Sequence, residues 1–320
     1  MKKQILLFVV LIGFGTFFFV GFQRKPTFKR QFIKIPIHFF PFGNRATMQV
    51  EVEGKQYSLL IDLGSSHPLD LHEKFIQKIK DKKLIGVSNY KNIRGDVFTS
   101  RKFQIPAVKI LNWTIKNLVV CEESVDFINA AEIWPSIGIW NRVKDELQLV
   151  MIQGRIGLPV FKESDCFFDF PNSVIFLGNN LGSCCSLEGS IQIPFELEEC
   201  GVILSVDTDL GMKKFLLDTG FTHSVLRESL VEKKGAKKTK RGDIFYVNKD
   251  LIIGGHSLGG WQFWLLEFSD IFKCDGIFGI DFFKKHAIYL DFHNKVAYIK
   301  RHQTVQERWL SWANGFPKSA

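Results

Sequence analysis

The chain has 320 residues, of which 46% are hydrophobic, and it carries a formal net charge of +9. This length allows one large or two ordinary domains with a sizeable core. The positive charge is dispersed, and its densest run lies between Lys233 and Arg241. We interpret this run as a solvated loop, with an acidic partner or an anionic lipid surface as the alternative, and we expect no nucleic-acid partner.

The six cysteines do not have the spacing of a metal site. None stands in a C-x-x-C pair, and the adjacent Cys184 and Cys185 are poorly placed to bond to each other. Disulfides between some of the cysteines remain open, but the pattern does not indicate a small scaffold held together by disulfides. We therefore expect no structural zinc.

The first 26 residues have the pattern of a membrane anchor. After Lys2 and Lys3, the segment from Ile5 to Phe22 is apolar except for three glycines and one threonine. At a rise of about 1.5 Å per residue this segment extends roughly 27 Å, which is enough to span a bilayer core. Because no A-x-A site follows, we expect an uncleaved single-pass anchor with the rest of the chain outside the cytoplasm, and a cleaved signal peptide is the alternative.

The segments that follow have the alternation of short strands. Thr27 to Pro41 is typical of a linker with an entry strand. Strands are predicted over Thr47–Val52 and Tyr57–Ile61, joined by a turn at Glu53–Gln56. Leu71–Ile79 is amphipathic with helical spacing, so a short helix is predicted there.

Two further strands are predicted, over Val97–Phe98 and Ile105–Val120. An extra segment follows at Asp126–Ile152, in which apolar residues from Trp140 to Val150 recur at helical spacing. We interpret this segment as a helix packed on the outside of the domain, and a lid over a binding site is the alternative.

A second set of strands begins after residues 179–190, which are rich in Gly, Ser and Cys and predict a linker. Val202–Asp207 is predicted as a strand and Asp209–Gly211 as a turn. The next strand ends at Asp218, as the earlier strand Tyr57–Ile61 ends before an aspartate.

Two aspartates stand in the same local pattern. An apolar strand leads into Asp62–Gly64 in one case and into Asp218–Gly220 in the other, and a second apolar run follows each. The two stretches align without a gap, and His67 matches His223. The glycine lets the backbone fold closely around the acid.

The repetition continues downstream of both aspartates. Gln153–Phe161 aligns with Asp275–Phe283, and Arg94–Phe98 aligns with Arg241–Phe245. Self-similarity of this extent indicates a duplicated domain. In the tail, Thr304–Glu307 has the pattern of a capping box and predicts a short helix. We divide the chain into an anchor at 1–26, a first lobe at 27–178, a linker at 179–190, a second lobe at 191–300 and a tail helix at 301–320.

The duplicated Asp loops resemble those of the aspartic peptidases. The arrangement is similar to the two-lobed, pepsin-like members, with compact motifs of the retroviral, retropepsin-like type. The resemblance covers roughly residues 45 to 300. It implies a mostly β fold with two homologous β-barrel lobes and a cleft between them.

The same resemblance implies that Asp62 and Asp218 form a catalytic dyad for peptide hydrolysis. One carboxylate would activate a water, and the other would donate its proton to the scissile carbonyl, so no metal ion or cofactor is required. The expected partner is a peptide or protein substrate, and two lobes in one chain predict a monomer. The supporting residues that the match implies are Gly64, Ser65, Thr219, Gly220 and Thr222.

Two residues depart from the pattern of this family. Leu63 stands where a Thr or Ser is usual, and Arg155 stands where an apolar residue is usual. The loss of one hydroxyl from a buried network is worth about 1 kcal/mol or more. A protein with the same fold that binds a peptide or partner at the membrane without cleaving it is therefore the alternative. The hairpin that closes over substrate in the family is expected near Lys91–Ser100.

A competing motif occurs at Gly255–Gly259, which matches G-x-S-x-G and would make Ser257 the nucleophile of a serine hydrolase. That motif requires a strand before it and a helix after it. The segment Trp261–Phe268 alternates and is aromatic, which favours a strand instead. We expect the glycines here to form turns between strands.

Overall fold

The structure is a computed structural model, and it describes residues 32–39, 45–123, 152–179, 181, 185–232, 235–238 and 244–302. Three predicted features lie outside these ranges: the anchor at 1–26, nearly all of the extra segment at 126–152, and the tail helix beyond residue 302. In the described ranges, no helix has the length and apolar character needed to cross a bilayer.

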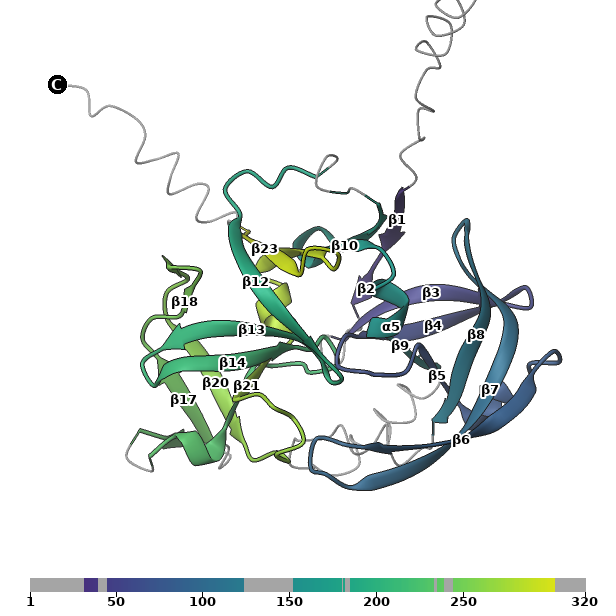
Figure 1. Cartoon of the computed structure of the whole chain (residues 1–320), viewed down its shortest axis with the longest axis horizontal. Coiled ribbons are helices and arrows are strands. Elements are labelled where there is room, and N and C mark those ends of the chain that lie inside the picture. The colour runs from purple at the N-terminus through teal and green to yellow at the C-terminus, as the bar shows by residue number, and fades with distance from the viewer. Residues whose placement is uncertain are drawn as a thin grey trace, which may run out of the picture. The chain divides into compact units, whose positions relative to one another are not determined.

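The first half of the described chain is built mainly from strands (Figure 1). Its strands are β1 (Phe32–Pro36), β2 (His38–Phe39), β3 (Ala46–Val52), β4 (Lys55–Asp62), β5 (Leu69–His72), β6 (Lys83–Lys91), β7 (Val97–Ile110), β8 (Trp113–Glu123), β9 (Gly154–Gly157), β10 (Asp165–Asp169) and β11 (Val174–Gly178). The helical elements are the single turns α2 (Glu73–Ile76), α5 (Leu158–Phe161) and η1 (Phe170–Asn172).

The second half has a similar content. Its strands are β12 (Ile191–Glu198), β13 (Gly201–Thr208), β14 (Gly211–Leu217), β15 (Val225–Arg227), β16 (Lys237–Lys238), β17 (Ile244–Asn248), β18 (Ile252–Ile253), β19 (His256–Ser257), β20 (Trp261–Leu266), β21 (Gly276–Phe278), β22 (His286–Asp291) and β23 (Val296–Arg301). The helical elements are η3 (Glu228–Leu230) and α6 (Ile280–Phe283).

The order of neighbouring strands repeats between the halves. In the first half the order is β3-β4-β9-β5-β8-β7, and in the second half it is β13-β14-β21-β15-β20-β17. The pairing registers agree as well, because Leu59 lies opposite Gly154 in one half and Phe215 lies opposite Gly276 in the other. The gapless alignment of the two Asp motifs is therefore also a structural equivalence.

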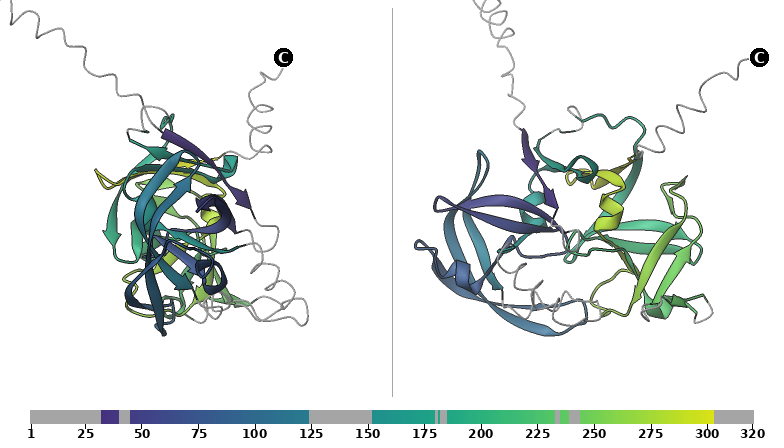
Figure 2. Two further views of the ribbon diagram at one scale, coloured as in Figure 1. Left: turned by 90° about the vertical axis from the view of Figure 1, so that its right-hand side faces the viewer. Right: turned by 180° about the vertical axis from the view of Figure 1, so that it is seen from behind.

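An additional pairing of β3 with β7 closes the strands of the first half into a barrel, with Glu51 opposite Lys109. Strands from both halves also share one sheet, in the order β1-β11-β10-β22-β23-β12. Seen from behind, the blue strands of the first half and the green strands of the second half form separate groups (Figure 2). Because one sheet crosses the division, the limits 27–178 and 191–300 given to the lobes stay a prediction.

The turn between β3 and β4 shows how the sequence sets this topology. Glu53 and Gly54 both have positive φ, 49° and 76°, in a connection of two residues. Such a turn has a twist that matches the strands it joins, and glycine adopts it without strain. The hairpin therefore carries the chain directly from β3 into β4, which ends at Asp62.

Phenylalanines fill much of the core. Phe278 stacks on Phe215 at a centroid distance of 4.5 Å and on Phe282 at 4.0 Å, and all three side chains are fully buried. Phe161, Phe168 and Phe283 are buried in the same hydrophobic cluster. This packing adjoins the strand that leads to Asp218, because Leu217 pairs with Phe278 and Asp218 N donates to Phe278 O.

Most predicted strands are present, and one predicted element is wrong. The expected helix over Leu71–Ile79 is reduced to one turn at Glu73–Ile76, because β5 continues to His72. All four residues of β5 are buried, and the strand pairs with β8 on one side and β9 on the other. Tertiary pairing thus overrides the local helical periodicity.

The aromatic stack allows a test of the core. We expect Phe278→Ala to lower the free energy of unfolding by roughly 3–5 kcal/mol, because it leaves a cavity between two rings. Chemical denaturation would measure the change. Met212→Ala, at a side chain that is 64% exposed, is the control and should have little effect. A small loss for Phe278→Ala would show that this stack does not stabilise the second half.

Candidate active site

Two aspartates occupy equivalent places at the ends of buried strands. Asp62 is the last residue of β4, and Asp218 directly follows β14. Each carboxylate accepts a hydrogen bond from the glycine two residues later: Gly64 N donates to Asp62 Oδ1 at 3.1 Å, and Gly220 N donates to Asp218 Oδ1 at 2.7 Å. The turn therefore holds the acid in a fixed orientation.

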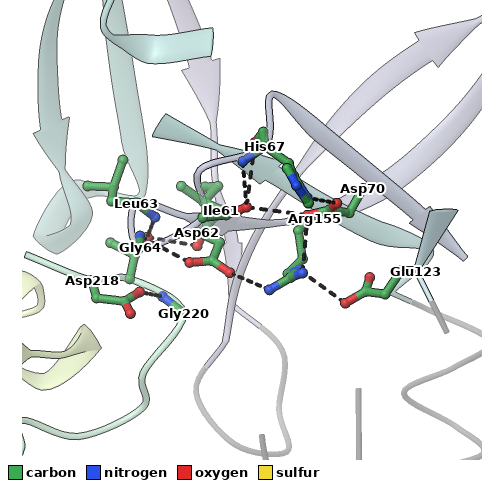
Figure 3. A network of polar contacts seen from close by, with 12 residues as sticks. Ile61, Asp62, Leu63, Gly64, His67, Asp70, Glu123, Arg155, Asp218 and Gly220 are labelled. Carbon is green, nitrogen blue, oxygen red and sulfur yellow. Dashed lines mark hydrogen bonds and ion pairs between the residues drawn. The ribbon is translucent and has the colours of Figure 1, made fainter. Parts of the chain in front are cut away.

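The two loops face each other at close range (Figure 3). A Cβ atom added at Gly64 would overlap with the carboxylate of Asp218, and one added at Gly220 would lie 2.7 Å from Asp62 Oδ1. Each glycine thus makes room for the carboxylate of the opposite loop. Burial and the nearby charge of Asp62 raise the pKa of Asp218 well above its usual range.

Thr219 joins the two loops through its hydroxyl. Its Oγ1 accepts from Leu63 N at 3.1 Å and donates to Ile61 O at 2.7 Å. The equivalent position in the first loop is Leu63, whose side chain is fully buried in the hydrophobic core. Only the second loop therefore supplies a side-chain hydroxyl that bonds to the other loop, namely that of Thr219. The first loop supplies the apolar side chain of Leu63 at the equivalent position.

The other two predicted supporting hydroxyls bond elsewhere. Ser65 Oγ donates to Asp70 Oδ2 at 3.3 Å, and Thr222 Oγ1 lies 3.0 Å from His223 Nδ1. Of the residues predicted for the site, the structure thus brings together the two aspartates, Gly64, Gly220 and Thr219. Ser65 and Thr222 belong to neighbouring polar contacts.

Arg155 is the unexpected member of the site. It lies on β9, which pairs with the strand β4 that ends at Asp62, and its guanidinium contacts three carboxylates. Nη1 is 3.1 Å from Asp62 Oδ2, Nη2 is 3.1 Å from Asp70 Oδ2, and Nε is 3.0 Å from Glu123 Oε1. Figure 3 shows the guanidinium between Asp62 and Glu123, on the side of Asp62 that faces away from Asp218.

His67 adds a second positive charge to this cluster. Its Nδ1 lies 2.8 Å from Asp70 Oδ1. Burial opposes the charged imidazolium, but the bond to Asp70 outweighs it and raises the pKa of His67 to about 10. Burial likewise opposes the charge of Asp70, yet Arg155 and His67 hold the pKa of this carboxyl below its usual value. Burial raises the pKa of Glu123 to about 7.

Three residues of this region have the atom types of a metal site. The ligand atoms of His67, Asp70 and Cys121 lie within 4.8 Å of one another. However, one oxygen of Asp70 already contacts His67 and the other contacts Ser65 and Arg155. A divalent ion would have to displace these contacts beside a fixed guanidinium charge, so the cluster fits a metal poorly.

A hairpin of the first half reaches the second half. It consists of β6 and β7, with its tip at Asn92–Asp96. Ser269 N donates to Ile93 O at 2.9 Å, and the Ile93 side chain packs against the hydrophobic cluster that contains Phe268 and Cys274. The expected hairpin near Lys91–Ser100 is present, and its tip is bonded to the opposite half.

The G-x-S-x-G segment does not have the geometry of a nucleophile elbow. Ser257 lies at the end of the short strand β19, is exposed and donates a hydrogen bond to Asp250. The segment that follows is strand β20, where the elbow requires a helix. The glycines at 254 and 255 form the turn between β18 and β19, as the sequence predicts.

Sequence analysis missed most of the charged cluster. Arg155 was noted only as a departure from an apolar position, and Asp70, Glu123 and His67 received no role. The one signal in the sequence was the arginine itself, because a charge in a buried strand requires partners. Nothing in the spacing of residues 70 and 123 identified them as those partners.

Comparisons with known proteins bear on the fold. No protein-family model matches the chain, and no curated protein matches it. Solved structures do match. Basic 7S globulin from soybean has a TM-score of 0.58 and 10% identity, covering 91% of this chain and 100% of that chain. Conglutin gamma, a basic 7S globulin from lupine seeds, has a TM-score of 0.59 and 10% identity over the same shares.

An aspartic proteinase from Irpex lacteus matches with a TM-score of 0.56 and 14% identity, covering 85% of this chain and 97% of that chain. The chain therefore has an aspartic-protease-like fold, mostly β, with a barrel and sheets. Because the fold is shared by a proteinase and by globulins, it does not decide whether the chain is a catalyst. The retropepsin-like character of its motifs stays a prediction.

The bridging hydroxyl of Thr219 can be tested by its effect on stability. Thr219→Val leaves the buried Leu63 N–H and Ile61 C=O without this partner. A buried polar group that loses its hydrogen bond destabilises the fold by roughly 1–3 kcal/mol. We expect Thr219→Val to lower the free energy of unfolding by an amount in this range. Thr219→Ser keeps a hydroxyl and should retain most of the wild-type stability. Thr222→Val removes a hydroxyl from the same loop without touching the bridge, so it is the control. Equal losses for Thr219→Val and Thr222→Val would contradict the role of the bridge.

Proposed function

We propose that this protein is an aspartic-type endopeptidase in which Asp62 and Asp218 hydrolyse a peptide bond. One observation carries the proposal: each carboxylate occupies the space left by the glycine of the opposite loop. Two buried carboxylates at such close range cannot both ionise easily, so one proton is retained between them. This is the charge state that general acid–base hydrolysis requires.

The chemistry follows from the two environments. The raised pKa of Asp218 favours its protonated form, so it can donate a proton to the scissile carbonyl and would recover that proton when the tetrahedral intermediate collapses. Asp62, as the carboxylate, would take a proton from the attacking water and pass it to the leaving amine. The loop amides of Gly64 and Gly220 fix both side chains in place, so little reorganisation is needed during the reaction.

An extended peptide is the substrate class that suits the fold. Strand-like segments bind by backbone pairing, with side chains entering alternate pockets. The β6–β7 hairpin would have to release its bond from Ile93 to Ser269 to admit such a segment and would then close over it. With the anchor predicted over 1–26, we place this activity at the outer side of a membrane.

A non-catalytic binding protein is the second candidate. It is favoured by Leu63, which removes one hydroxyl from the loop interface, and by Arg155, which occupies one oxygen of Asp62. The similarity to the seed globulins is compatible with it. In this case the carboxylate pair would serve only the packing of the loops.

Peptide cleavage distinguishes the two candidates. We expect the purified full chain to cleave members of a diverse peptide library between acidic and neutral pH, and Asp62→Asn and Asp218→Asn each to reduce kcat/KM by several orders of magnitude. Mass spectrometry of the products would measure this. Asp250→Asn, at a half-buried acid between β17 and β18 that accepts a hydrogen bond from Ser257, is the control. A folded wild-type chain without cleavage at any pH would favour the binding protein.

The hairpin contact offers a reversible test of substrate access. A Cβ atom at Gly95 would lie 3.2 Å from Ser269 Cβ, close to the roughly 3.5–4.5 Å of a disulfide. We expect Gly95→Cys combined with Ser269→Cys to lose cleavage of long peptides when oxidised and to regain it with a reductant. Each single variant controls for the strain at Gly95, whose φ is +89°. Full activity of the crosslinked form would show that substrate does not enter beneath this hairpin.

A further inference from the structure

The charged cluster around Arg155 has no counterpart at the equivalent strand positions in the described part of the second half. Arg155 lies opposite Leu60 in the β4–β9 pairing, and the equivalent residue opposite Leu216 is Ile277. Asp70 lies opposite Cys121 in the β5–β8 pairing, and the equivalent pair between β15 and β20 is Leu226 with Leu265. Polar groups thus occupy places that the other half fills with apolar side chains.

Such a cluster is costly unless every charge has a partner. The side chains of Arg155, Asp70 and Glu123 are 14%, 4% and 2% exposed, so they are largely removed from water. Unpaired charges in such a position would destabilise the fold by several kcal/mol each. The guanidinium supplies these partners, because each of its three nitrogens lies within 3.1 Å of a different carboxylate and Nη1 also donates a hydrogen bond to Asp62 Oδ2. One guanidinium thus connects Asp70 and Glu123 to Asp62 of the dyad.

We propose that Arg155 is a positioning residue that assigns the two roles of the dyad: it holds Asp62 as the carboxylate, so that the proton resides on Asp218. The proposal rests on the proposed function for its catalytic meaning. The charge assignment itself is a property of the folded chain and can be measured without a substrate. Two observations carry it: the 3.1 Å contact from Nη1 to Asp62 Oδ2, and the absence of an equivalent cation at Ile277 beside Asp218 in the described structure.

The surrounding charges support this assignment. The groups around the guanidinium and its acids are Asp62 on β4, Asp70 on β5 with His67 before it, Glu123 and Cys121 on β8, Tyr90 on β6, Arg45 before β3, and Asp218 from the second half. His67 neutralises Asp70, and Glu123 is largely uncharged below its pKa of about 7. Below that pH, the charge of Arg155 is left for Asp62, and Arg45 adds a further positive charge near Glu123.

The sign of the effect follows from the charge balance. A cation beside a carboxylate favours its ionised form and lowers the pH at which it ionises, typically by 1–3 units. Without Arg155, no cation among the described residues contacts Asp62. The first proton to leave the dyad would then create a negative charge near Asp70 that has no direct counter-ion. We therefore expect that ionisation, and with it the acidic limb of any pH–rate profile, to move up by roughly 1–3 pH units.

The experiment is a titration of carboxyl groups by NMR on the full chain labelled with ¹³C at aspartate. Asp62→Asn and Asp218→Asn assign the two signals. Arg155→Ile places in β9 the residue that the second half has at the equivalent position. We expect the Asp62 signal to respond at lower pH than the Asp218 signal in the wild type, and its midpoint to rise in Arg155→Ile. Arg155→Lys keeps the charge and should show a smaller displacement.

Two further variants keep the test decisive. If Arg155→Ile does not fold, Arg155→Ile combined with Asp70→Leu recreates the apolar arrangement of the second half and should displace the midpoint in the same direction. Arg227→Met is the matched control. Its side chain is 12% exposed and pairs with Glu267 and Asp270, not with an aspartate of the dyad. It should lower stability and leave the dyad titration unchanged.

The outcomes separate this proposal from the proposed function. An unchanged midpoint in folded Arg155→Ile, or a wild type in which Asp218 ionises first, would overturn the role of Arg155 whether or not the chain cleaves peptides. A displaced midpoint in a chain that cleaves nothing would uphold the charge assignment and refute the peptidase. With activity present, the acidic limb of kcat/KM should move with the NMR midpoint.

Discussion

The reciprocal fit of the two Asp loops is the constraint on which the site depends. Gly64 leaves room for the carboxylate of Asp218, and Gly220 leaves room for that of Asp62. A side chain at either glycine would separate the acids, and separated carboxylates would lose the coupling that retains one proton. The hydroxyl of Thr219 then fixes the distance between the loops, because it bonds to backbone groups of Ile61 and Leu63 on the two sides of Asp62. The barrel strands and the phenylalanine core hold the ends of β4 and β14 in register for this contact.

The two halves of the duplicated architecture differ in the residues that surround their aspartates. Most core positions around Asp218 are apolar, whereas the strands beneath Asp62 contain an arginine and two acids. A symmetrical pair of loops would give two carboxylates with similar environments. The ion pairs of Arg155 make the environments different, and the loss of a hydroxyl at Leu63 increases the difference. Both departures lie in the first half, so the second loop provides the hydroxyl bridge and the first provides the charged support.

Much of the fold could be predicted from local pattern and repetition. Alternation of apolar residues located strands such as β3, β4 and β13, and the alignment of Gln153–Phe161 with Asp275–Phe283 matched the registers of β9 and β21. The helix expected over Leu71–Ile79 was wrong, because pairing with β8 and β9 decides the conformation of a buried segment. Ser65 and Thr222 were assigned by position in the motif, yet the orientation of a hydroxyl depends on the partners that folding brings within reach.

The sequence by itself determined the duplication, the two Asp turns and the glycines within them, because these are encoded in short runs with fixed local geometry. It also showed that Arg155 breaks an apolar pattern. Only the tertiary structure decided what that arginine contacts, since Asp70 and Glu123 come from strands far from it in the chain and meet it through the pairing of β5, β8 and β9. The contact from the hairpin tip to Ser269 was likewise invisible in the sequence, because it joins the two halves through backbone atoms that any residue possesses.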